Sequence, residues 1–202
     1  EVTKSLYEQV IAASSDALSD SDRNATLQYI KQLRSHLIQV GNATIGNRYL
    51  FGGYNTTTSP FTENSEGKVI YNNTDLDTAT TDTINTLKSQ NIEYEIGTGS
   101  FIKVSFTGID IFGSGDNNLF TVIDNLITTM ENGGSTIDIG NFVKPLQDKQ
   151  EDILVQITEI GGIIKRLDFV EDRYSLDEIN YQTIKSNVED IDVAEVIMKL
   201  RL

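Results

Sequence analysis

The sequence has no cysteine, no tryptophan, one histidine and two prolines among its 202 residues. Without cysteine the chain can form neither a disulfide framework nor a thiolate site. The one histidine, His36, lies within a predicted helix, where we expect a partly exposed surface residue rather than a zinc ligand. No nucleophile motif accompanies it, so no Ser-His-Asp triad is indicated. These residue types predict no catalytic residue, no cofactor site and no metal site, and therefore a protein that is not an enzyme.

Basic residues are also scarce, since 16 Lys and Arg stand against 30 Asp and Glu and give a net charge of −14. Such a surface repels phosphate backbones and anionic lipid, so we expect neither a nucleic-acid nor a membrane partner. The sequence shows no signal peptide and no apolar run long enough to cross a bilayer. Because Glu1 enters a helical pattern at once, we expect the chain to be a fragment of a longer protein.

Several loops invite a functional interpretation that their spacing does not support. Residues 97–99 and 113–118 are rich in glycine, but neither has the Walker lysine, the Rossmann spacing or the EF-hand register. We therefore predict hairpin turns at both. Residues 189–192 (EDID) could bind a cation, although a solvated helix face or a charge patch between subunits is the favoured interpretation. No spacing singles out a carboxylate pair for glycosidase chemistry.

The composition changes twice along the chain. Residues 57–139 carry twelve acids and three bases, whereas residues 1–56 carry five of each and residues 140–202 carry thirteen and eight. The middle segment is also rich in Thr, Asn, Asp and Gly. The two edges of this change predict an acidic segment inserted between two flanks.

The N-terminal flank has the periodicity of two helices. An apolar stripe runs through Leu6, Val10, Ala13 and Ala17, with Tyr7, Ile11 and Leu18 beside it. Residues 19–22 (SDSD) break the first helix and offer N-caps for a second. The second helix runs through Leu27, Ile30, Leu33, Leu37, Val40 and Thr44, and Gly41 and Gly46 indicate that it ends nearby.

The C-terminal flank has the strongest periodic pattern in the chain. Seven apolar or aromatic residues repeat at a spacing of seven and are our helix-packing candidates: Leu146, Ile153, Ile160, Leu167, Tyr174, Tyr181 and Val188. A second apolar position in each heptad extends this stripe, which we call the seam. Ile157 and Ile164 occupy it in the first part of the helix, and Ile184, Ile191 and Met198 occupy it in the last part, on the other side of the seam. The change of side indicates a shift of heptad phase near residues 170–171. One helix over residues 141–202 would be roughly 90 Å long. Gly161 and Gly162 could break it, and it would pair with the two N-terminal helices or with other chains.

The middle segment alternates like strands before it returns to helical periodicity. Apolar residues alternate at Ile92, Tyr94 and Ile96 and again at Ile102, Val104 and Phe106, with a shorter candidate at residues 68–71. Residues 118–130 suit one helix face, ended by Asn132-Gly133-Gly134. The sequence therefore predicts an α+β protein. Residues 1–56 and 140–202 form an elongated, antiparallel, discontinuous helical rod domain, and residues 57–139 form an inserted acidic β-rich outer domain.

Between rod and insert, residues 46–61 (GNRYLFGGYNTTTSPF) concentrate three glycines, four aromatics and one of the two prolines. The motif NRYLFGG (47–53), followed by SPF (59–61), resembles the FlgL-type hook–filament junction family of bacterial flagella, also called hook-associated protein 3. The motifs KRLDF (165–169), INY (179–181) and SNVEDIDVAE (186–195) resemble the late helix of the flagellin superfamily. The resemblance covers roughly residues 1–60 and 140–202, and the first motif is the more specific.

The resemblance implies a flagellin-like rod whose exit toward the outer domain is the stretch 46–61. Glycines would let the backbone turn sharply, and apolar side chains would fasten the exit. The junction candidates are Tyr49, Leu50, Phe51, Gly52, Gly53, Pro60 and Phe61, with Tyr54 beside them. An ordinary turn with a local aromatic cluster is the simpler alternative.

The resemblance also implies a structural, self-associating protein that adapts hook to filament. Its partners would be copies of itself in a ring, the neighbouring hook-associated protein, flagellin subunits and an export chaperone. Its location would be the extracellular flagellum, reached through the flagellar secretion system without a cleaved signal. Family members have further helical segments at both ends that form the inner tube, and we expect these to be missing here. Two alternatives stay open: a filament flagellin, and an extracellular glycan-binding or hydrolytic module in residues 57–139.

Overall fold

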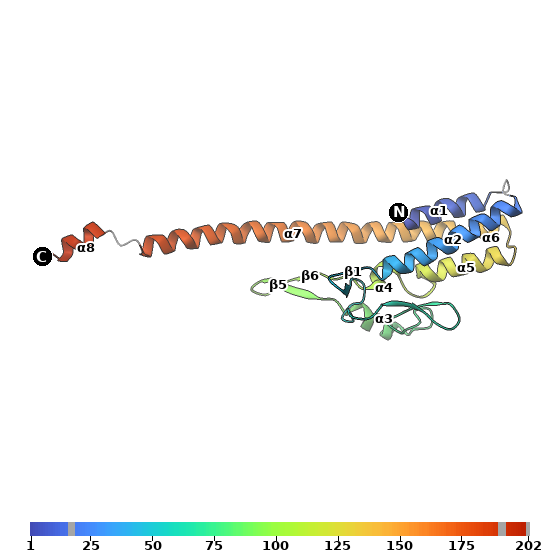
Figure 1. Ribbon diagram of the computed structural model, residues 1–202, viewed down its shortest axis with the longest axis horizontal. Coiled ribbons are helices and arrows are strands. Elements are labelled where there is room, and N and C mark those ends of the chain that lie inside the picture. Colours follow the sequence, from blue (N-terminus) through green and yellow to red (C-terminus); the bar gives the residue numbers. More distant parts are fainter. Residues whose placement is uncertain (16–18, 190–192, 201–202) are drawn as a thin grey trace. The chain divides into compact units, whose positions relative to one another are not determined.

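The computed structural model describes residues 1–15, 19–189 and 193–200, and it is mainly helical with three small antiparallel sheets (Figure 1). Contacts divide the chain into two compact units, Glu1–Glu159 and Ile160–Leu202. The elements in order are α1 (Val2–Ala13), α2 (Asp20–Gly41), β1 (Thr44–Ile45), β2 (Arg48–Tyr49), β3 (Phe61–Glu63), β4 (Val69–Tyr71), α3 (Thr81–Lys88), β5 (Glu93–Gly97), β6 (Ser100–Lys103), α4 (Gly108–Phe112), a 3₁₀ helix (Gly115–Asn117), α5 (Leu119–Glu131), α6 (Thr136–Gly140), α7 (Val143–Glu189) and α8 (Val193–Leu200).

The N-terminal helices form as their periodicity predicts. Ser19 caps α2, since its hydroxyl accepts a hydrogen bond from the Asp22 N–H at 3.2 Å. Helix α1 ends at Ala13, earlier than expected, and the predicted stripe residues Ala17 and Leu18 lie outside the described residues. Most buried positions of both helices belong to one common core: Leu6, Val10 and Ala13 of α1, and Ile30, Leu33 and Leu37 of α2. Leu27 of α2 is also buried but lies outside this cluster.

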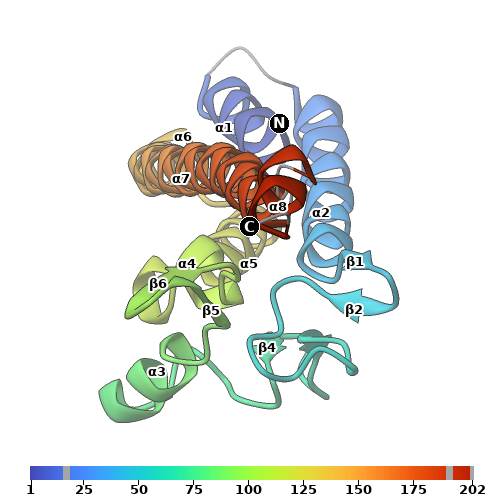
Figure 2. The same cartoon turned by 90° about the vertical axis from the view of Figure 1, so that its left-hand side faces the viewer.

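Helix α5 completes the helical part of the first unit. It packs against α2, while α6 packs against α1 and α5 (Figures 1 and 2). Asn118 caps α5 by accepting a hydrogen bond from the Phe120 N–H at 2.9 Å, and Asn132 ends the helix, as the sequence predicts. Five buried side chains of α5 join the common core: Leu119, Phe120, Val122, Ile123 and Leu126.

The sheets are three separate two-stranded hairpins, β1–β2, β3–β4 and β5–β6. The predicted alternation places β5 and β6 correctly, and residues 97–99 turn between them as expected. Residues 113–118 do not form a hairpin turn, so that prediction was wrong. A capping box at Thr107 starts helix α4 before them, and Asn118 starts α5 after them, so a 3₁₀ turn joins two helices instead. Helices supply more of residues 57–139 than strands do, which the sequence did not predict.

Helix α7 passes from the first unit into the second. Pro145 lies in the first turn of α7. A backbone N–H in that turn has no hydrogen-bond partner within the helix, so its absence in proline costs no helical hydrogen bond. Gly161 and Gly162 do not break the helix, because each costs only about 1 kcal/mol relative to alanine and many neighbours are good helix formers. Within the helix expected over 141–202, the structure describes α7 over Val143–Glu189 and α8 over Val193–Leu200. Asp190 and Asp192 of the candidate cation site, with Ile191, lie outside the described residues.

Candidate functional site: the junction after helix α2

The chain leaves α2 through a tight hairpin. Strands β1 and β2 pair Thr44 with Tyr49 and Ile45 with Arg48, so Gly46 and Asn47 alone form the loop. Both loop residues have positive φ, +56° and +64°, as a type I′ turn requires. Glycine meets this requirement without strain, and asparagine is among the residues that tolerate it best. Gly46, directly before the motif, therefore has a local backbone role.

The second pair of glycines lets the backbone fold tightly on itself. A Cβ atom on Gly52 would overlap the carbonyl oxygen of Asn55. Gly53 has a φ of +64°, and a Cβ there would lie 3.0 Å from the carbonyl oxygen of Gln90. Neither position accepts a larger residue without movement of the backbone, which explains the Gly-Gly pair of the motif.

Aromatic rings fill the space beneath this turn. Phe61 is at the centre, with ring centroids 5.1 Å from Tyr71, 4.9 Å from Phe112 and 5.4 Å from Phe120. Phe51 meets Phe112 edge-on at 6.1 Å. These five residues, which we call the aromatic cluster, come from the motif, a strand and two helices. Offset and edge-to-face contacts of this kind add to the stabilisation from burial.

Hydrogen bonds hold the backbone of the stretch against its surroundings. Asn42, at the end of α2, donates from Nδ2 to the Phe61 carbonyl at 2.8 Å and accepts from the Phe61 N–H at 2.9 Å. The Tyr71 hydroxyl donates to the Phe51 carbonyl at 2.7 Å and accepts from the Gly108 N–H at 3.2 Å. Burial raises the pKa of Tyr71, and the hydrogen bond from Gly108 opposes part of that rise. The polar groups beside the aromatic cluster are thus largely satisfied.

Two glycines allow this close packing. An ideal Cβ on Gly41 would lie 2.7 Å from the Phe61 ring, and one on Gly108 would lie 2.5 Å from Phe61 and 2.6 Å from Tyr71. Ring and backbone therefore touch on both sides of Phe61. The sequence pattern predicts only the end of a helix at Gly41 and gives no sign of a close contact at Gly108.

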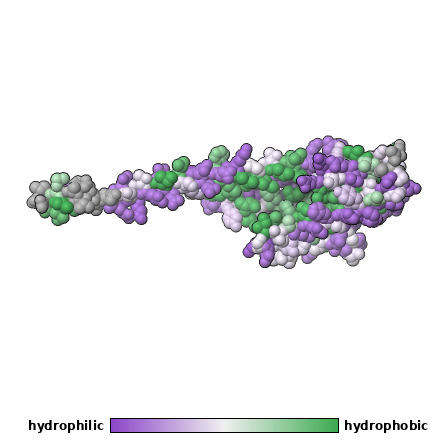
Figure 3. Space-filling model, turned by 45° about the horizontal axis from the view of Figure 1, so that its top comes forward, coloured by the Kyte–Doolittle hydropathy of each residue, from purple (hydrophilic) through white to green (hydrophobic). Residues whose placement is uncertain are grey.

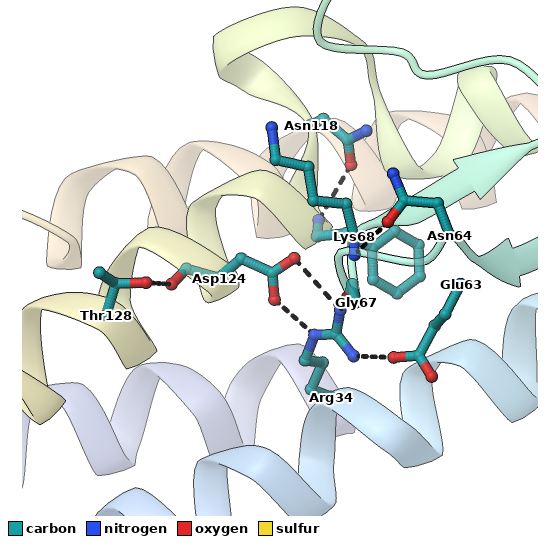
Figure 4. A network of polar contacts seen from close by, with 9 residues as sticks. Arg34, Glu63, Asn64, Gly67, Lys68, Asn118, Asp124 and Thr128 are labelled. Carbon is teal, nitrogen blue, oxygen red and sulfur yellow. Dashed lines mark hydrogen bonds and ion pairs between the residues drawn. The ribbon is translucent and has the colours of Figure 1, made fainter.

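A polar network fastens the β3–β4 hairpin to α2 and α5 (Figure 4). Arg34 of α2 forms ion pairs with Asp124 of α5 and Glu63 of β3 and donates to the Gly67 carbonyl at 2.6 Å. Burial opposes the charge of Arg34, but its hydrogen bonds to the two carboxylates outweigh burial and raise its pKa. One planar guanidinium thereby joins three elements, which suits arginine better than lysine.

Some of the junction candidates lie in the core, and others lie at the surface. Phe61, Pro60, Gly52 and Gly53 are buried, and Phe51 is half-buried against the core. Tyr49 is half-buried, whereas Leu50 is 41% and Tyr54 66% exposed. The cluster members Tyr71, Phe112 and Phe120 were not predicted as site residues, because only the tertiary fold brings them to Phe61.

The helix-packing candidates differ according to their unit. In the first unit, Leu146 is fully buried and Ile153 half-buried. In the second unit, Ile160 is half-buried, and the remaining four are exposed: Leu167, Tyr174, Tyr181 and Val188. Hydrophobic side chains therefore lie among polar ones along the surface of α7 (Figure 3).

A cleft of about 650 Å³ beside α2, α5 and the β3–β4 turn is the concave feature closest to an acidic pocket. Two of its carboxylates, Asp124 and Glu131, pair with Arg34 and Lys31, and no aromatic side chain lines it. His36 is exposed on α2. Among residues 1–15, 19–189 and 193–200, no three His, Cys, Asp or Glu side chains are grouped to hold a metal ion. None of the helices in these described ranges is both long and apolar enough to cross a membrane.

Comparison with known proteins agrees with the motifs, although no family model matches the chain. Flagellar hook-associated protein 3 of Escherichia coli K12 is 24% identical over 210 residues, which cover 92% of this chain and 60% of the relative. The protein of the same name from Salmonella typhimurium is 23% identical over 215 residues, covering 94% and 62%. The chain thus spans about three fifths of the length of these curated relatives.

Solved structures share the fold. A protein described as a flagellar hook-associated protein from Vibrio parahaemolyticus superimposes with a TM-score of 0.77 at 20% identity, covering 92% of this chain and 78% of the other. Flagellar hook-associated protein 3 from Legionella pneumophila gives 0.74 at 13% identity, covering 93% and 88%. The resemblance to FlgL-type hook-associated proteins, which the motif NRYLFGG followed by SPF first indicates, is confirmed in sequence and in fold.

Proposed function

We propose that this chain is a structural part of the bacterial flagellum that acts without catalysis as an adaptor at the hook–filament junction. The proposal rests on relatives named flagellar hook-associated protein 3 and on a fold shared with such proteins. One structural observation carries it further: the heptad positions of α7 are apolar yet exposed from Leu167 to Val188. Exposed seams of this kind stabilise a protein when other helices cover them.

In this proposal the helical rod of residues 1–56 and 140–202 packs laterally against copies of itself in a ring. Apolar seams drive the contact, and charged edges set its register. The ring contacts the neighbouring hook-associated protein and flagellin subunits, and an export chaperone binds the protein before it is assembled. The ring lies outside the cell, where it is delivered by the flagellar secretion system.

Residues 57–139 are proposed to be the outward, variable domain of the subunit. Helix α5 packs on α2, and the aromatic cluster and the Arg34 network join this segment to the rod. The junction residues would then fix the angle at which the segment leaves the rod. Rigid fastening suits an adaptor, because it must transmit torque from the hook to the filament.

The two alternatives find less support. A filament flagellin would be expected to lack the NRYLFGG motif. A glycan-binding or hydrolytic module would need aromatic side chains or a pair of available carboxylates in a cleft. No aromatic side chain lines the cleft beside α5, and two of its three carboxylates, Asp124 and Glu131, are ion-paired, with Glu66 as the third. The adaptor therefore remains the function that the site supports best.

A gene deletion tests this function. Cells without the protein should build hooks but release unattached flagellin into the medium, and the intact gene should restore filaments. Cells that keep normal filaments after the deletion would contradict an adaptor role. Cells that lose a glycan-related activity while they keep filaments would favour the alternative in residues 57–139.

A further inference from the structure

The turn between α5 and α6 (Figure 1) contains the pair Asn132 and Gly133. Among the sixteen asparagines of the chain, only Asn132 is followed by glycine. Its side chain is exposed at the end of α5. Gly133 has a φ of +72°, and among the described residues no atom beyond its chain neighbours lies within 4 Å of a Cβ built on it. The pair is thus open to solvent, and nothing described packs on the glycine.

An asparagine followed by glycine can rearrange without a catalyst. The backbone nitrogen of Gly133 attacks the side-chain carbonyl carbon of Asn132 and closes a cyclic succinimide. The bond from that carbon to the side-chain nitrogen breaks, and ammonia leaves with the proton of the attacking nitrogen. Water then opens one of the two ring carbonyls and gives aspartate or isoaspartate, in which the main chain runs through the former side-chain carbon. Glycine favours ring closure, because it has no Cβ to obstruct the attack and its backbone turns freely.

Ring closure requires movement at the end of α5, and the structure places the pair where movement costs little. The Gly133 N–H donates to the Met130 carbonyl at 3.2 Å and must leave it before the nitrogen can attack. Helix ends open at a small cost in free energy. The chain beyond the pair is held by a bond from the Gly134 N–H to the Thr129 carbonyl at 2.8 Å. Local fraying therefore releases the attacking nitrogen without unfolding the unit.

The surroundings of other asparagines obstruct the same reaction. The Asn42 amide is bonded to both backbone groups of Phe61, and Asn118 is only 2% exposed. Asn55 and Asn141 are exposed, but they precede threonine and phenylalanine. The Cβ and the larger side chain of those residues crowd the attacking nitrogen. Exposure and a following glycine therefore coincide only at Asn132.

We propose that Asn132 is the site at which the folded protein deamidates to aspartate and isoaspartate. This chemistry goes beyond the proposed adaptor function and does not depend on it. Either product places a carboxylate beside Glu131 at the C-terminal end of α5, where the helix dipole disfavours negative charge. Isoaspartate also lengthens the main chain between α5 and α6. It disturbs the turn that Arg23 fastens by donating to the Gly134 carbonyl at 2.7 Å.

Incubation of the intact chain in warm, mildly alkaline water enriched in heavy oxygen tests the proposal. Peptide mapping by mass spectrometry should show conversion at Asn132 ahead of Asn55 and Asn141, with one solvent oxygen in each product and isoaspartate among the products. Circular dichroism should show that the chain stays folded. Conversion should be at most about tenfold slower than in the urea-unfolded chain, because the helix end frays readily. A greater slowing, an unconverted Asn132, or equally fast conversion at Asn55 or Asn141 overturns the proposal.

A variant distinguishes this reaction from other sources of added negative charge. Asn132→Gln keeps a neutral amide at the exposed position, but its longer side chain must close a larger ring, which forms far more slowly. Ion-exchange chromatography should therefore show an acidic form that grows with time in the parent chain and not in Asn132→Gln. Equal growth in both chains would place the reaction elsewhere and contradict the proposal. Because the isolated chain is measured, the result does not depend on whether the protein acts as an adaptor.

Discussion

At the scale of single residues, the junction depends most on Phe61. Its ring lies against three other rings, and its backbone N–H and carbonyl are both bonded to Asn42. The side chain is only 2% exposed. One residue therefore couples the end of α2 to the start of the β3–β4 hairpin, through packing and through hydrogen bonds.

Replacing Phe61 should therefore be costly. Phe61→Ala should lower the free energy of unfolding by about 3–5 kcal/mol, the usual cost of removing a buried phenylalanine ring. Phe101→Ala is the matched control, because Phe101 is 56% exposed on β6, and it should cost less than about 1 kcal/mol. Urea unfolding followed by circular dichroism measures both. Equal losses would mean that the aromatic cluster does not hold the junction.

Tyr71 should make stability depend on alkaline pH. Burial raises its pKa in the folded chain, so stability is fully present below the ordinary tyrosine pKa of about 10 and falls as pH rises through the folded-state pKa. Tyr71→Phe should flatten this fall, while it lowers stability at neutral pH by about 1 kcal/mol through loss of the hydrogen bond to the Phe51 carbonyl. Thermal melts at neutral and alkaline pH give the comparison. An unchanged alkaline slope in Tyr71→Phe would show that another group causes it.

At the scale of elements, local periodicity predicts the helices better than it predicts the turns between them or the tertiary contacts of their side chains. Helices α2 and α5 and the β5–β6 hairpin follow from apolar spacing and from caps within a few residues. The turn at residues 113–118 was misassigned because glycine and asparagine also suit a link between helices. Phe112 and Phe120 could not be assigned to the site, since nothing in local sequence indicates that they meet Phe61.

The glycines of α7 give a test at this scale. Apart from the adjacent residues and the neighbouring backbone of α7 itself, no atom lies within 4 Å of a Cβ built on Gly161 or Gly162. The double change to alanine should therefore stabilise the helix locally by about 0.5–1 kcal/mol per position, and amide hydrogen exchange around residue 161 should slow accordingly. Gly134→Ala is the control and should lower local stability instead of raising it, because the added Cβ would lie 2.5 Å from Thr129 Cγ2. Faster exchange in the α7 variant would mean that the glycines serve a bend.

At the scale of the whole molecule, one hydrophobic core unites α1, α2, α5 and the start of α7. It contains Leu6, Ile30, Phe61, Phe120 and Leu146, which come from both flanks and from the middle segment. Composition alone suggested separate domains over 57–139 and the flanks, and this division remains a prediction. The shared core depends on contacts between residues far apart in the sequence, which composition does not report.

The first unit should consequently fold without the second. A chain of residues 1–159 should unfold in one cooperative transition with nearly the same Tm as residues 1–202, since the core lies entirely within Glu1–Glu159. Residues 57–139 alone should lack such a transition, because α1, α2 and α7 supply much of the core around them. Differential scanning calorimetry distinguishes these outcomes, and a cooperative transition in 57–139 alone would instead favour an independent insert.

The central claim, an adaptor between hook and filament, is tested most directly by immuno-electron microscopy of isolated flagella. Antibodies raised against the whole folded chain, and selected for binding within residues 57–139, the proposed outward segment, would be applied to flagella from the cells that encode this chain. The account predicts gold label in one narrow band where the hook meets the filament. Label distributed along the whole filament would identify a filament flagellin instead, and flagella without any label would contradict a structural role at the junction.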